Sequence, residues 1–239
     1  MKLLALDCSA VSASVSVWDG ERMLGEWFLH IPQTHSQTLM PMVRDLLEMA
    51  GIPLADMEVF AVSVGPGSFT GVRIGVSCVK GMALPGNTPC VGVSTLEAMA
   101  HPLAGLPGTV CAVMDARCAQ VYHARFSIGE GVRREGEEEA LPIASLPRRY
   151  ADVEGPIYLV GDGAVLCAQT AFVEDPRVRL VAEPLRFQRS SGVALAALQA
   201  IRRGEMQDAG SLAPVYLRLP QAERELKKRL GQTEGEKTG

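Results

Sequence analysis

Apolar and polar positions alternate through the first thirty residues with the period of a β-strand. Lys2–Ser9 is almost continuously apolar, and Ser12–Trp18 places alanine and valine at every second position against serine. A period of two predicts a strand with one buried face. Asp19 and Gly20 form a hairpin turn signal before a third strand-like segment, Met23–His30. The chain therefore opens with a predicted antiparallel meander.

A helical period replaces this alternation between His35 and Ala50. Thr34 or Ser36 can cap the predicted helix, and Gly51 followed by Pro53 would end it. The pattern then predicts a strand over Val59–Val64, a helix over Phe69–Leu84, a strand over Cys90–Val93 and a helix over Thr95–Leu103. The order βββαβαβα combines an antiparallel edge with parallel crossovers, which predicts an α/β fold with mixed sheets flanked by helices.

The second half of the chain, which begins near Thr109, repeats features of the first half. Segment 111–126 aligns with segment 3–17 when Asp115 is set on Asp7, and segment 157–167 aligns loosely with segment 61–71 when Gly161 is set on Gly65. In each half a strand ends in Asp before a hairpin, and a later strand ends in Gly-x-Gly before a helix. Two echoes in the same order indicate an internal duplication; chance similarity of short apolar strings is the alternative.

The expected organisation is two lobes followed by a polar tail. Residues 1–104 form the N-terminal lobe, residues 105–219 the C-terminal lobe, and residues 220–239 a tail that we expect to be partly disordered. Within the second lobe, the charged segment Gly129–Ala140 predicts a solvated hairpin, Gln188–Arg203 a helix and Leu212–Arg218 a last extended segment.

Composition narrows the functional classes. The chain has 239 residues, a formal net charge of −4 and a pI of about 5.6. An acidic chain has no obvious positive electrostatic potential with which to bind a phosphate backbone, so another subunit would hold any nucleic acid. No apolar run approaches the roughly 20 residues that span a bilayer, and the N-terminal run is too short for a secretory signal. We therefore expect a cytoplasmic protein without membrane contact, whose six cysteines are reduced thiols.

Two features suggest a vestigial nucleotide or anion site. Asp7 ends a strand before a hairpin, as in actin-like ATPases, but no glycine follows it to open backbone N–H groups to phosphate; the alternative is that Asp7 caps the turn. Gly65, Gly67 and Ser68 form a turn at a predicted helix N-terminus, which is a potential anion site. The simpler interpretation is that Ser68 is an ordinary helix cap.

No catalytic or metal-binding constellation can be assembled from spacing. The glycine turn is neither a Walker A loop nor a G-x-G-x-x-G sequence, since Thr70 stands at the third glycine position. The four histidines, His30, His35, His101 and His123, show no metal-ligand spacing. We therefore expect no catalytic residue, no metal and no cofactor.

The predicted helix over His35–Ala50 has a wider apolar arc than one core contact requires. One face carries Leu39, Val43, Leu46, Leu47 and Ala50, and the flanks carry Met40, Met42 and Met49. Because methionine adapts its shape to a neighbour, methionines on the flanks suit a binding surface.

The predicted helix over Phe69–Leu84 has two apolar faces. One is a core stripe of Val72, Val76, Val79 and Ala83; the other consists of Gly71, Gly75, Cys78 and Met82. Each glycine in a helix costs about 1 kcal/mol against alanine, so two on one face require a reason. Close approach of another helix is such a reason, and that helix belongs either to the same lobe or to a partner chain. The excess apolar arc on both helices favours the partner.

Four segments resemble the TsaB family, which is also called YeaZ. The most specific is Gly65–Gly75 (GPGSFTGVRIG); Thr34–Leu47, Leu3–Ala10 and Pro214–Arg218 are similar to the family's first helix and two ends. Spacing and order agree from about Lys2 to Arg218. The resemblance implies a duplicated actin-like (ASKHA, ribonuclease H-like) fold, in agreement with the two echoed halves.

The resemblance also implies a function. TsaB-like proteins pair with the catalytic subunit TsaD and act with the ATPase TsaE, and the complex transfers a threonylcarbamoyl group to the adenosine beside the anticodon of ANN-reading tRNAs. A chain of this kind would contact tRNA only through the complex and form homodimers when alone. The interface implied for both partners comprises His35, Leu39, Met42, Val43, Leu46, Met49, Gly71, Ile74, Gly75, Cys78 and Met82.

Two other functions stay open. One is an independent ATP-dependent kinase or ATPase of the same fold, which the glycine-poor hairpin after Asp7 argues against. The other is an M22-type, glycoprotease-like metallopeptidase, which the missing metal ligands argue against.

Overall fold

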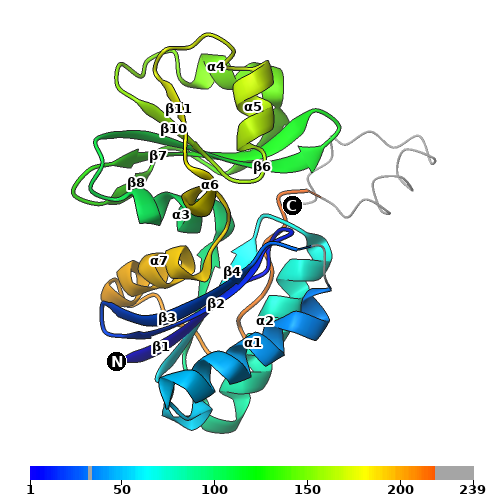
Figure 1. The fold of residues 1–239 in the computed structure, drawn as a ribbon, viewed down its shortest axis with the longest axis vertical. Helices are drawn as coiled ribbons and strands as arrows, with labels where there is room; N and C mark the ends of the chain where they lie inside the picture. The colour runs from blue at the N-terminus through cyan, green and yellow to red at the C-terminus, as the bar shows by residue number, and fades with distance from the viewer. Residues whose placement is uncertain (32–33, 219–239) are drawn as a thin grey trace, which may run out of the picture.

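The computed structural model describes residues 1–31 and 34–218, and the predicted polar tail, residues 220–239, lies outside them. Two mixed sheets with flanking helices form two lobes that face each other (Figure 1). Among the described residues, no helix is long and apolar enough to cross a membrane.

The first sheet has the strand order β3-β2-β1-β4-β5. Its strands are β1 (Lys2–Asp7), β2 (Ala13–Asp19), β3 (Arg22–Leu29), β4 (Val59–Gly65) and β5 (Cys90–Ser94). Strand β1 is antiparallel to β2 and parallel to β4, and β4 is parallel to β5. The predicted meander and the parallel crossovers are thus confirmed.

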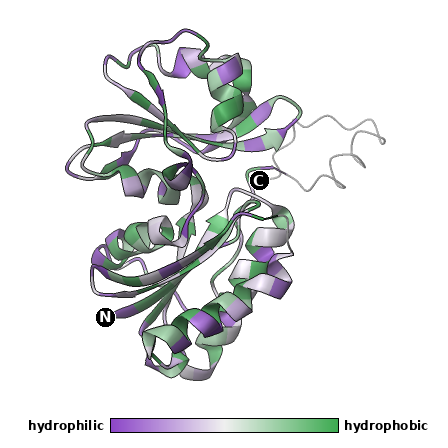
Figure 2. Cartoon of the chain, viewed as in Figure 1, coloured by the Kyte–Doolittle hydropathy of each residue, from purple (hydrophilic) through white to green (hydrophobic). Residues whose placement is uncertain are grey.

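Helices cover both faces of this sheet, because the side chains of its central strands alternate between two cores. Leu4 and Leu6 of β1 pack with α1 (His35–Ala50) and α2 (Phe69–Ala83). Leu3 and Ala5 pack on the opposite face with α7 (Ser190–Arg202). Figure 2 shows the correspondingly hydrophobic character of β4 between these layers.

The second sheet has the order β11-β10-β6-β7-β8, with β9 also paired to β7. Its strands are β6 (Gly108–Arg117), β7 (Gln120–Ile128), β8 (Val132–Arg134), β9 (Glu139–Pro142), β10 (Ile157–Val160) and β11 (Val178–Leu180). Strand β6 is antiparallel to β7 and parallel to β10, as β1 is to β2 and β4. The same topology in both lobes confirms the predicted duplication.

Shorter helices complete the two lobes. They are η1 (Leu54–Asp56), η2 (Leu84–Gly86), α3 (Thr95–Ala100), η3 (His101–Leu103), η4 (Ile143–Ser145), α4 (Leu146–Arg149), α5 (Ala164–Thr170) and α6 (Glu183–Arg186). The predicted helix over Thr95–Leu103 is therefore α3 continued by the 3₁₀ turn η3. All six cysteines are free thiols.

The structure corrects three expectations from the sequence. Helix α7, which the sequence assigned to the C-terminal lobe, packs on the first sheet because its apolar face completes that core. The charged segment Gly129–Ala140 forms no hairpin of its own: β8 and β9 pair separately with β7. Finally, the residue before α1, Thr34, makes no side-chain cap hydrogen bond.

Candidate functional site

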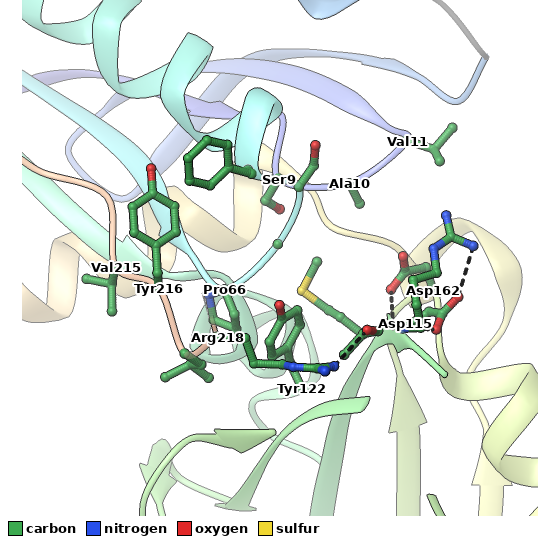
Figure 3. A pocket seen from close by; sticks show the side chains of 17 residues that line it. Ser9, Ala10, Val11, Pro66, Asp115, Tyr122, Asp162, Val215, Tyr216 and Arg218 are labelled. Carbon is green, nitrogen blue, oxygen red and sulfur yellow. Dashed lines mark hydrogen bonds and ion pairs between the residues drawn. The ribbon is translucent and has the colours of Figure 1, made fainter. Parts of the chain in front are cut away.

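A cleft of about 400 Å³ lies between the two lobes (Figure 3). Its lining comes from the hairpin after β1, the glycine turn before α2, the β6–β7 hairpin and the C-terminal segment that follows α7. Of the predicted nucleotide or anion site, Gly67 and Ser68 line the cleft, whereas Asp7 and Gly65 do not.

Asp7 is fully buried behind this cleft. One carboxylate oxygen accepts hydrogen bonds from the backbone N–H of Ser9 at 3.0 Å and from its hydroxyl at 2.9 Å, and the other has no partner. Burial raises the pKa of Asp7, against the lowering effect of the Ser9 hydrogen bonds. The bond to the Ser9 N–H is the turn-capping contact that the simpler interpretation of the sequence expected.

The glycine turn uses its own hydrogen-bond donors. The Ser68 N–H donates to the carbonyl of Ser9 at 2.6 Å, and the Ser68 hydroxyl accepts from the Gly71 N–H at 3.2 Å. Gly65 and Gly67 of this turn have positive φ, and a Cβ on Gly67 would overlap the Ser9 carbonyl. Ser68 is therefore a helix cap, and its own backbone N–H is not available to an anion.

The second lobe contributes the carboxylates of the cleft. Asp115 lies two residues before the end of β6, in the strand that corresponds to β1 with its terminal Asp7. Asp162 lies between Gly161 and Gly163, where the first lobe has Pro66. Asp162 accepts a hydrogen bond from the Asp115 N–H at 3.3 Å, and burial raises its pKa. The sequence comparison that set Asp115 on Asp7 and Gly161 on Gly65 was the signal that could have identified both carboxylates.

Cationic and aromatic side chains surround the cleft mouth. Arg117 forms an ion pair with Asp115 at 3.3 Å, and Arg218 donates to the Ala116 carbonyl at 3.0 Å. Tyr216 stacks on Phe69, with ring centroids 4.9 Å apart. The sequence did not predict that Tyr216 and Arg218 line this cleft, because only the tertiary fold brings the C-terminal segment back to it.

The predicted interface residues of α1 differ in how far they are exposed. Leu39, Met42, Val43 and Leu46 are buried in the core of the first lobe, so the lobe's own packing explains their apolar character. Met49 is 76% exposed. His35 is partly buried and forms a 2.7 Å hydrogen bond with the Ala10 carbonyl.

Contacts within the lobe explain the glycines of α2. A Cβ on Gly71 would overlap the Cys8 carbonyl oxygen, and a Cβ on Gly75 would lie 2.9 Å from Cys8 Sγ and 3.1 Å from Val62 Cγ2. They therefore let α2 approach the end of β1 and strand β4. Glycine at these positions is required by packing within the lobe. At Gly71 this packing includes α1, because the added Cβ would lie 3.3 Å from Cδ2 of His35, so these glycines do not by themselves indicate a partner chain.

An apolar stripe on α2 remains partly accessible. Ile74, Cys78 and Met82 are half-buried and pack against the core of the first lobe. With Met49 of α1, these residues form the exposed remainder of the predicted interface, which we call the α1–α2 surface. In the part of the chain that the structure describes, no group of three His, Cys, Asp or Glu side chains is arranged to hold a metal ion.

Comparisons with known proteins agree with this architecture. A family model described as TsaD, tRNA N6-adenosine threonylcarbamoyltransferase, matches residues 31–225. The tRNA threonylcarbamoyladenosine biosynthesis protein TsaB of Escherichia coli (strain K12) is 36% identical over 167 residues, 68% of this chain and 72% of that protein. The TsaB of Bacillus subtilis (strain 168) is 27% identical over 227 residues, 93% of this chain and 96% of that protein.

A solved structure extends the similarity to the whole fold. A Pseudomonas aeruginosa protein described as uncharacterized, with similarity to peptidase YEAZ, superposes with a TM-score of 0.79 at 31% identity, covering 91% of this chain and 99% of that one. Two lobes of identical strand order around one cleft define the class of duplicated actin-like α/β proteins. Within that class, the chain belongs to the TsaB family, whose members take part in tRNA threonylcarbamoyladenosine biosynthesis.

Proposed function

We propose that this chain is a non-catalytic subunit that binds TsaD, acts with TsaE, and so supports threonylcarbamoyl transfer to the adenosine beside the anticodon of ANN-reading tRNAs. It works in the cytoplasm and meets tRNA only within the complex. Membership of the TsaB family carries this proposal. The acidic net charge of −4 supports it, because a separate subunit would then have to hold the RNA.

The α1–α2 surface is the proposed docking site for TsaD and, in the free protein, for a second copy of this chain. Met49 is more exposed than expected for a side chain that serves only the core, and the half-buried Ile74, Cys78 and Met82 offer further apolar area. Methionine and cysteine side chains adapt to different partners, which suits a surface with two alternative occupants.

The test is association with TsaD and activity of the reconstituted system with and without this chain. We expect Met49→Glu and Cys78→Glu to weaken TsaD association at least about tenfold, as loss of an interface anchor does. The matched control is Leu166→Glu, which places the same charge on a 40% exposed apolar residue of α5. Failure of the unmodified chain to bind TsaD would overturn the proposed function. Binding of both variants with the affinity of the wild type would overturn only the assignment of the α1–α2 surface as the docking site.

An independent ATP-binding function is the second candidate, and the cleft is the observation that favours it. Asp115 and Asp162 line the space in which a nucleotide of an actin-like protein would lie. Calorimetric titration of the isolated chain with ATP and magnesium decides between the two. Tight, magnesium-dependent binding supports the second candidate, and no measurable binding supports the scaffold.

A further inference from the structure

The C-terminal segment that follows α7 is fixed to the first lobe along its length. The backbone of Gln207 exchanges two hydrogen bonds with Cys90 of β5, at 2.7 and 2.9 Å, and Leu212 is fully buried in the core with α1 and α2. Lys80 of α2 donates to the Gly210 carbonyl at 3.2 Å. The segment is therefore part of the first lobe up to the edge of the cleft.

At the cleft edge the segment lies directly on the glycine turn. The Val215 N–H donates to the Val64 carbonyl at 2.7 Å, and a Cβ on Gly65 would overlap the Val215 carbonyl. Tyr216 is held by α2: its ring stacks on Phe69, and its hydroxyl accepts a 2.7 Å hydrogen bond from Arg73 Nε. These contacts aim the next residues across the cleft.

Arg218 then reaches the other lobe. Its guanidinium donates to the carbonyl of Ala116 at 3.0 Å, near the end of β6 (Figure 3). The residues that follow, Arg117, Cys118 and Ala119, have φ of 65°, 54° and 55°, a region that residues with side chains rarely adopt. Three consecutive left-handed residues make this hairpin tip costly to maintain, so a contact from outside the hairpin stabilises it.

We propose that residues 213–218, which we call the C-terminal strap, hold the β6–β7 hairpin against the first lobe and thereby set the width of the cleft. The strap is anchored on one lobe by Val215 and Tyr216, and Arg218 is its contact with the other. Release of Arg218 frees the hairpin tip and opens the cleft mouth. This role belongs to the isolated chain and is independent of docking to TsaD.

Hydrogen exchange of the full chain, measured at the backbone amides of residues 115–120, tests whether the C-terminal strap stabilises the β6–β7 hairpin. We expect Arg218→Ala to accelerate exchange there about tenfold, the effect of losing one hydrogen bond from a charged donor. Arg218→Lys, which keeps a cationic donor, should restore most of the protection. The matched control is Arg203→Ala, which removes an arginine whose hydrogen bonds go to Glu205 at the end of α7.

A second variant keeps the test decisive if Arg218→Ala does not fold. Tyr216→Phe retains the stacking on Phe69 but loses the hydrogen bond from Arg73, and we expect a smaller acceleration at the same amides. Exchange at residues 115–120 that is unchanged from wild type in folded Arg218→Ala or, if that variant does not fold, in Tyr216→Phe would overturn the proposal. Equal acceleration by Arg203→Ala would overturn it as well.

Discussion

At the scale of single residues, Asp7 is a carboxyl group that the fold removes completely from water. Burial raises its pKa, so the ionised form opposes folding, and its contribution to stability decreases as the pH rises from the unfolded value of 3.8 through the folded pKa. Asp7→Asn keeps an oxygen for the Ser9 donors and offers an amide to the neighbouring Ser63 hydroxyl. We therefore expect a higher free energy of unfolding at pH 7.

Urea denaturation at pH 7 and at pH 4 measures this effect. The gain from Asp7→Asn should shrink at pH 4, where the wild-type carboxyl is more fully protonated. A variant that is clearly less stable than wild type at pH 7 would contradict the prediction, because it would show that the ionised carboxylate supports the fold.

His123 in β7 is the second residue with a definite pH signature. It shares a 2.9 Å hydrogen bond with the buried Tyr150 hydroxyl, and burial, assisted by Arg149 and Arg125, lowers its pKa from 6.5 to about 4. Between about pH 6.5 and about pH 4, His123 is therefore protonated in the unfolded chain but not in the folded chain. Stability should decrease by about 3 kcal/mol as the pH falls from about 6.5 to about 4.

The measurement for His123 is the free energy of unfolding across that pH range. In His123→Gln the slope with pH should flatten, while the stability at pH 7 changes by the cost of an altered hydrogen bond to Tyr150. An identical slope in wild type and variant would assign the acid sensitivity to other groups.

At the scale of elements, α2 offers a matched comparison between two glycines. Gly71→Ala should destabilise the protein by about 2–3 kcal/mol, because the new Cβ overlaps the Cys8 backbone carbonyl. Gly81→Ala should stabilise it by up to about 1 kcal/mol, because no atom lies within 4 Å of its Cβ and alanine favours the helix. Chemical denaturation separates the two; effects of the same sign would contradict the assigned packing of α2.

At the scale of the whole molecule, the lobes are not consecutive pieces of sequence. Helix α7 supplies the core on one face of the first sheet, and Leu212 contributes to the other. We therefore expect a fragment of residues 1–104 to lack cooperative unfolding and a dispersed NMR spectrum, since both cores are incomplete. A fragment that unfolds cooperatively like the intact chain would show that α7 and Leu212 are dispensable.

The sequence by itself determined the local elements and their duplication. The bounds of α1 agree with the prediction because a helical period and a terminal glycine are local signals. The echo of Asp7 in Asp115 correctly indicated two lobes, because the apolar strand pattern around each Asp is a local signal that both halves carry. The four segments that resemble TsaB were sufficient for the family.

Only the tertiary structure decided what each apolar or glycine face packs against. Periodicity shows that a face is buried but not by which neighbour, so the sequence favoured a partner helix for the glycines of α2, whereas their neighbours in the lobe are Cys8, Val62 and His35 of α1. Likewise, no local signal places α7 on the first sheet or brings Arg218 to Ala116, because these contacts join residues about a hundred or more positions apart. Long-range packing selects them, and it is there that the cleft and its strap are made.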